Sequence, residues 1–245
     1  MELLRVPRQR HSVPCGHEPA ARGHRRKRSR RRGRTGPDPG TSPRSLRADD
    51  CVLREIEETL QAAEGSSGDT ALSTAKFFLG IALTSREAAA DRDRGLELVV
   101  QVCDVWVRER TRLYLAPSAQ AVAARERARR GDPDGAIPVM RTAVNDLFET
   151  GQLTGGVLAA ARLVEMLLDR GAHGDAAEAE AAIDWLANLP TAEGWAIRDT
   201  WLLRLRALLS RTRGDDVAYH DLVSRYWAMA KSAGFEGHIA MAEAM

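Results

Sequence analysis

The stretch Arg125–Val144, RERARRGDPDGAIPVMRTAV, has the pattern of two helices joined by a tight turn. Gly131 can adopt the left-handed backbone conformation that ends a helix. Asp132 can then accept hydrogen bonds from the free amides of the next helix. Ala136 is small enough to let the second helix pack closely on the first. The stretch therefore predicts a unit of helix, Gly-Asp turn and helix.

Units of this kind recur along the chain, and equivalent small residues are spaced by 41 residues: Gly95, Ala136, Ala177 and Ala218. Gly-Asp turns also lie near Gly171 and Gly214. The pattern resembles the tetratricopeptide repeat, whose usual period is about 34 residues. We therefore expect an all-α, tetratricopeptide-like α-solenoid of about four helix-turn-helix units, packed through the four small residues as anchors. An irregular bundle of eight helices is the alternative.

The predicted repeat domain covers residues 50–245. It opens with a helix over 51–63, which places Val52, Leu53, Ile56 and Leu60 on one face. The first helices of the four units are expected near 72–84, 116–128, 156–168 and 197–210. In a solenoid these helices line the concave face, where ligands usually bind.

Residues 1–49 have a different composition from the rest of the chain. Residues 1–50 hold 14 basic and five acidic side chains, a net charge of +9, whereas residues 51–245 carry −7. Large apolar residues are few in this segment, so it cannot offset the entropy of ordering its backbone and is expected to be disordered. The alternative is that 1–49 is not a genuine translated segment.

Eight positive charges lie within ten residues of this tail: Arg25, Arg26, Lys27, Arg28, Arg30, Arg31, Arg32 and Arg34. Such a run binds phosphate backbones by releasing counterions, and acidic lipid surfaces by the same attraction. Nucleic acid is therefore an expected partner only through the tail, because the repeat domain is acidic.

Sequence motifs for catalysis are missing. No phosphate-binding loop, dinucleotide-binding glycine pattern or Gly-x-Ser-x-Gly elbow occurs. We predict no catalytic, cofactor-binding or metal-binding residue and no enzymatic activity. Cys15, Cys51 and Cys103 are too widely spaced for a disulfide framework or a zinc site. Because no apolar run approaches the roughly 18–20 residues that span a bilayer, a reduced cytoplasmic protein is expected.

Isolated candidates for a site have simpler interpretations. His220 lies near Asp216 and Asp221, but a histidine on a polar helix surface is the ordinary reading. Cys103 follows several valines and is expected in the core. The five tryptophans could line a groove, although repeat core is the more usual role: Trp106, Trp185, Trp195, Trp201 and Trp227.

Three stretches carry a family resemblance: residues 125–144, residues 163–186 and residues 196–245, which end in GFEGHIAMAEAM. They are similar to the C-terminal tetratricopeptide-like region of actinobacterial multidomain adenylate/guanylate cyclase–ATPase signalling proteins. In that family the repeats follow cyclase and ATPase domains, and the motifs of those domains are missing here. The resemblance therefore implies a regulatory module of signal transduction, and a gene fragment is one expected origin.

The sequence thus favours a non-catalytic module that binds a protein, peptide or small effector on the concave face of its first helices. A nucleic-acid-binding protein that acts through the basic tail is the second hypothesis. A nucleotide cyclase or ATP-binding regulator, by lineage from the resembled family, is the third.

Overall fold

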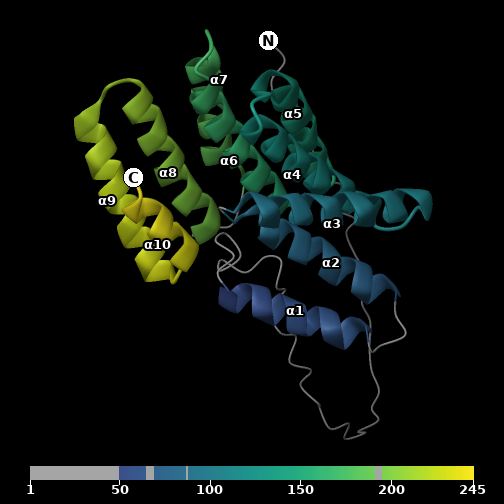
Figure 1. The fold of residues 1–245 in the computed structure, drawn as a ribbon. Helices are drawn as coiled ribbons and strands as arrows, with labels where there is room; N and C mark the ends of the chain where they lie inside the picture. Colours follow the sequence, from purple (N-terminus) through teal and green to yellow (C-terminus); the bar gives the residue numbers. More distant parts are fainter. Residues whose placement is uncertain (1–49, 65–68, 87, 191–194) are drawn as a thin grey trace, which may run out of the picture.

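The structure is a computed structural model, and it describes residues 50–64, 69–86, 88–190 and 195–245 (Figure 1). The described residues form helices and no strand, which confirms the all-α prediction. The elements are α1 (Asp50–Glu64), α2 (Asp69–Thr84), α3 (Ala89–Arg108), the 3₁₀ turn η2 (Leu113–Leu115), α4 (Ala116–Arg129), α5 (Pro133–Glu149), α6 (Leu153–Arg170), α7 (Asp175–Ala187), α8 (Ala196–Thr212), α9 (Asp216–Ala233) and α10 (Glu236–Glu243). The tail 1–49 and its basic run lie outside the described residues.

Neighbouring helices pack in consecutive pairs. The most extensive contacts join α2 to α3, α4 to α5 and α8 to α9, and α6 packs on both α5 and α7. The first helix of each pair also contacts the first helix of the next, since α2 meets α4, α4 meets α6 and α6 meets α8. Figure 1 shows that the first described helix, α1, lies beside α2 and that the last, α10, lies beside α9. The fold therefore brings α2, α4, α6 and α8 together, and these cover the expected first helices.

The predicted turn chemistry holds at two of the three Gly-Asp turns. Asp132 accepts a hydrogen bond from the amide of Gly135 at 2.9 Å, and Asp215 accepts one from the amide of Ala218 at 3.0 Å. Asp175 differs, because α7 already begins there and its carboxylate accepts from the amide of Ala172, in the turn before the helix. Gly131, Gly171 and Gly214 all have positive φ, as helix-ending glycines require.

An ion pair closes three of the turns in the same way. In each, an arginine near the end of the first helix reaches an aspartate five residues later, at the start of the second. The N···O distances are 2.7 Å for Arg86–Asp91, 2.5 Å for Arg127–Asp132 and 2.6 Å for Arg170–Asp175. The steps between these aspartates are 41 and 43 residues, and 40 more residues lead to Asp215.

The four predicted anchors do not all pack between helices. Gly95 is buried and Ala136 is fully buried, but Ala177 is exposed and Ala218 is half-buried. The buried positions in α7 and α9 are Ala179 and Tyr219. Because each residue turns a helix by about 100°, a two-residue offset moves Ala177 about 200° away from the packed face. The 41-residue period is therefore wrong as a guide to packing in the last two pairs.

Gly95 shows why a small residue is needed in the first pair. A Cβ atom there would lie 2.6 Å from the carbonyl oxygen of Gly80 on α2 and 2.8 Å from the Cβ of Leu83. A Cβ on Gly80 would meet the carbonyl oxygen of Gly95 at 2.8 Å. The two glycines thus bring the backbones of α2 and α3 into direct contact, and no side chain fits between them.

Candidate ligand-binding site

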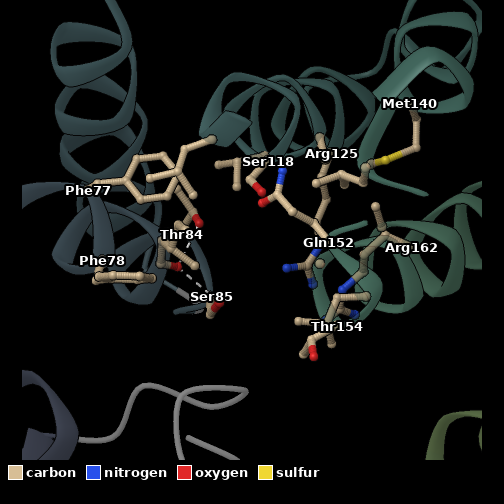
Figure 2. Close-up of a pocket in the computed structure, with 18 of the residues that line it drawn as sticks. Phe77, Phe78, Thr84, Ser85, Ser118, Arg125, Met140, Gln152, Thr154 and Arg162 are labelled. Atoms are coloured by element: carbon tan, nitrogen blue, oxygen red, sulfur yellow. Dashed lines mark hydrogen bonds between the residues drawn. The ribbon is translucent and has the colours of Figure 1, made fainter. Parts of the chain in front are cut away.

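A cavity of about 540 Å³ opens between α2, α4 and α6, beside η2 and the turn from α5 to α6 (Figure 2). This volume lies within the range of about 300–1,000 Å³ that is typical of small-molecule pockets. The lining residues come from these elements and from α5: Phe77, Phe78, Ile81, Thr84, Ser85, Leu115, Ser118, Ala121, Val122, Arg125, Glu126, Met140, Leu147, Gly151, Gln152, Leu153, Thr154, Gly155, Leu158, Ala159 and Arg162. The cavity thus lies on three of the four first helices.

The aromatic side chains that line this cavity both come from α2. Phe77 is 1% exposed and packs on Trp106 of α3, with ring centroids 5.1 Å apart. Phe78 meets Phe77 edge to face at 5.7 Å. Ile81 follows one turn later, and Leu158 of α6 also lines the cavity. Aromatic and aliphatic walls of this kind bind the apolar part of a ligand.

Arg125 is the unusual polar residue of the wall. Figure 2 shows its side chain extending from α4 toward α6 and Arg162. It is half-buried, and it makes no hydrogen bond or ion pair with any residue that the structure describes. Burial lowers the pKa of its guanidinium well below the usual value, and the positive charges of Arg162 and Arg129 lower the pKa further. The charges of Glu165 and Glu126 offset this lowering only in part. Arg125 is therefore a cation close to other cations that makes no direct ion pair with the described residues.

The other charges at and behind the cavity wall are paired around two glutamates, the buried Glu126 and the half-buried Glu165. Glu126 is 2% exposed; its carboxylate lies 2.6 Å from Arg129 and 3.3 Å from Arg92. Glu165 lies 2.5 Å from Arg162 and 3.0 Å from Arg204. Arg129 also donates to the carbonyl oxygen of Thr84 at 3.0 Å. These bonds engage both glutamates with other arginines, so their charges act on Arg125 without a direct ion pair.

The electrostatics of Glu165 show how strong the local positive charge is. Burial by itself raises the pKa of this carboxyl, but the charges of Arg162, Arg204 and Arg125 outweigh burial and bring the pKa to about 2. The group has a formal net charge of +3, because it holds two glutamates, Glu126 and Glu165, and five arginines: Arg92, Arg125, Arg129, Arg162 and Arg204. Counting the exposed Asp169 beside Glu165 leaves +2. An anion in the cavity would be attracted by this group.

Two hydroxyl groups add hydrogen-bonding capacity near Arg125. Ser118 on α4 and Thr154 on α6 line the cavity, are half-buried, and make no hydrogen bond with the described residues. Gln152 is already engaged, because its side-chain amide donates to the carbonyl oxygen of Tyr114 and to the hydroxyl of Thr150. The cavity therefore joins an apolar wall to a small set of unpaired donors.

The residues singled out from the sequence do not form this site. Among the anchors, Gly95 and Ala136 lie in helix contacts, and the basic run of the tail lies outside the described residues. Sequence reasoning missed Arg125, although it stands in the stretch that predicts the fold. Arg125 and Arg162 are 37 residues apart in the sequence and lie on different helices. Only the fold brings them together, so the sequence carries no signal of the site.

The isolated candidates have structural roles or lie on the surface. His220 is exposed. Burial raises the pKa of the Cys103 thiol to about 11, assisted by the charge of Asp104, so this cysteine is not an activated nucleophile. Trp106 and Trp201 are buried, whereas Trp227 is 38% exposed. No tryptophan lines the cavity.

Comparisons of the chain with models of known families, with curated proteins and with solved structures found no match in any of the three. Among the described helices, none combines the length and apolarity needed to cross a bilayer. In the same part of the chain, no cluster of three His, Cys, Asp or Glu side chains could hold a metal ion.

Proposed function

We propose that the chain is a non-catalytic helical-repeat module that binds an effector on the face of its first helices. It would act as a regulatory part of a signalling system, as the resemblance to the cyclase–ATPase proteins implies. The observation that carries the proposal is the cavity between α2, α4 and α6, with the unpaired Arg125 in its wall.

The architecture supports a tetratricopeptide-like solenoid of four units. The helices pair in sequence, and successive first helices touch one another. The repeated arginine–aspartate closure of three turns indicates that the pairs are variants of one unit. In a solenoid the face of the first helices is a natural binding surface, because each unit contributes one helix to it.

The proposal can be tested with the fluorescent probe anilinonaphthalene sulfonate, which has an apolar aromatic body and one anionic group. We expect saturable binding of one probe molecule to the full chain, detected by fluorescence titration. Ala121→Phe, which places a ring in the cavity, should abolish this binding. Gln120→Phe, on the exposed side of the same helix, should leave it unchanged. Unchanged probe binding by a folded Ala121→Phe variant would contradict the proposal.

A second proposal concerns the basic tail and rests on its eight charges in ten residues. The tail would bind nucleic acid, and the acidic domain would contribute little. Deletion of residues 1–48 should then abolish DNA binding that weakens steeply with salt. Nucleic-acid binding that survives the deletion would contradict this second proposal. Formation of any cyclic nucleotide by the purified chain would contradict the non-catalytic assignment.

A further inference from the structure

We propose that the cavity takes a small amphipathic carboxylate, with its anionic group on Arg125 and its apolar body against Phe77 and Phe78. This inference rests on the proposed function and specifies the chemical class of the effector. It follows from three properties of the cavity: one unpaired cation, an excess of positive charge around it, and an apolar wall on the opposite side.

The charge of the ligand follows from the unpaired cation. A buried charge without a counterion is costly, and proteins normally pair it or shift its ionisation. Arg129 and Arg162 have glutamate partners at 2.6 Å and 2.5 Å, whereas Arg125 has none. An anion beside Arg125 would relieve the repulsion that the other arginines exert on it. The cavity is therefore completed by a negative group rather than by a neutral or positive one.

The number of anionic groups follows from the donors that remain. One guanidinium and the hydroxyls of Ser118 and Thr154 lack partners among the described residues. The planar fork of a guanidinium matches the two oxygens of a carboxylate in a bidentate pair. A single carboxylate therefore uses the donors present, and a more highly charged group would exceed them.

The apolar body follows from the opposite wall. Phe77 and Phe78 on α2 face the space that separates them from Arg125, as Figure 2 shows. The volume of about 540 Å³ suits a small molecule enclosed by the cavity. The basic run of the tail has the same sign of charge as the arginines. Charge complementarity thus favours an external anion over that part of the chain.

Binding can be measured by displacement of anilinonaphthalene sulfonate from the full chain with three ligands of equal chain length below their micellar concentrations. These are decanoate, decan-1-ol and decyltrimethylammonium. We expect decanoate to bind at least about tenfold more tightly than decan-1-ol, since a charge-assisted pair is stronger than a neutral hydrogen bond. The cationic ligand should bind most weakly. Equal binding of decanoate and decan-1-ol would overturn the inference.

Arg125→Met separates a ligand-binding role from a structural one. It should abolish the preference for decanoate while binding of decan-1-ol persists, and it should raise the melting temperature of the free protein by removing the unpaired charge. Arg206→Met, at an exposed position outside the cavity, should alter neither quantity. A lower melting temperature for Arg125→Met, with the decanoate preference retained, would assign Arg125 to the fold and refute the proposal.

Different results would contradict the carboxylate assignment and the proposed function. If Ala121→Phe abolishes probe binding but decanoate shows no preference over the alcohol, the cavity binds ligands and only the carboxylate assignment is wrong. If probe and decanoate both bind equally well to Ala121→Phe, the cavity is not the site and the proposed function is wrong as well.

Discussion

Acid should destabilise this protein through one buried imidazole, that of His238 on α10. His238 is 0% exposed, and its Nδ1 lies 2.7 Å from the hydroxyl of Tyr226 on α9. Its ring meets Trp201 of α8 edge to face, with centroids 4.9 Å apart. Its Nε2 has no hydrogen-bond partner. The imidazole therefore joins α8, α9 and α10 in a site with no acceptor for a second ring proton.

The folded protein consequently resists protonation of His238. Burial lowers the pKa of the imidazole to about 3, and the charges of Arg162 and Arg204 contribute to the shift. In the unfolded chain the pKa is about 6.5. Between these two values the unfolded chain binds a proton that the folded chain does not. Stability is therefore complete above pH 6.5 and is lost as the pH falls toward 3.

The magnitude follows from the size of the shift. Each pH unit well inside the window changes the free energy of unfolding by up to about 1.4 kcal/mol. A fall from pH 6.5 to 4.5 should therefore cost about 2 kcal/mol, since the unfolded imidazole is only half protonated at pH 6.5. The carboxyl of Glu165, with its pKa of about 2, titrates below this interval. Urea unfolding followed by circular dichroism at several pH values measures the slope.

The matched control is the double variant Tyr226→Phe/His238→Phe. It keeps two aromatic rings in place and removes both members of the hydrogen bond, so neither position keeps an unsatisfied polar atom. Its stability should lose the pH dependence between 6.5 and 4.5 that His238 supplies. Equal slopes for the wild-type chain and the double variant would refute the reasoning. His238→Phe alone should cost about 1–3 kcal/mol, because the Tyr226 hydroxyl then loses its hydrogen bond with the imidazole.

Three further substitutions test the fold. Gly95→Ala should cost roughly 1–3 kcal/mol in urea unfolding because its Cβ meets backbone at 2.6 Å, whereas Gly155→Ala, whose nearest neighbour is a leucine side chain at 3.3 Å, should be neutral or stabilising. Glu165→Gln should cost about 3–5 kcal/mol by leaving Arg162 and Arg204 without their counterion. Glu180→Gln, in the exposed pair with Arg213, should change the melting temperature little. Asp215→Ala should cost about 1 kcal/mol through the lost cap on α9, and a loss no larger than that of Asp216→Ala would contradict the capping role.

Local chemistry made the helices and most turns predictable. The helix expected over 51–63 is α1, from Asp50 to Glu64, and Ile56 is buried as expected. The four expected first helices are α2, α4, α6 and α8. These predictions succeed because helix periodicity, a left-handed glycine and a capping aspartate act within a few residues of one another.

Which side of each helix is packed against its neighbours was harder to predict from the sequence. The aspartates of successive turns are not evenly spaced: 43 residues separate Asp132 from Asp175, and 40 separate Asp175 from Asp215. A constant period therefore does not follow the packed face of the helices. Asp175 illustrates the consequence, since Ala179, four residues later, is buried while the predicted Ala177 is exposed. A difference of two residues is small in an aligned sequence, but it moves a side chain to the opposite side of a helix.

The sequence alone determined an acidic helical domain, a basic N-terminal segment and the absence of known catalytic motifs. Only the tertiary structure decided where binding can occur. Arg125, Arg162 and Phe77 belong to three helices and carry no shared signal in the chain. An isolated arginine in a helix is an ordinary surface residue. Arg125 becomes a binding group here because folding half-buries it beside other arginines whose glutamate partners are already engaged.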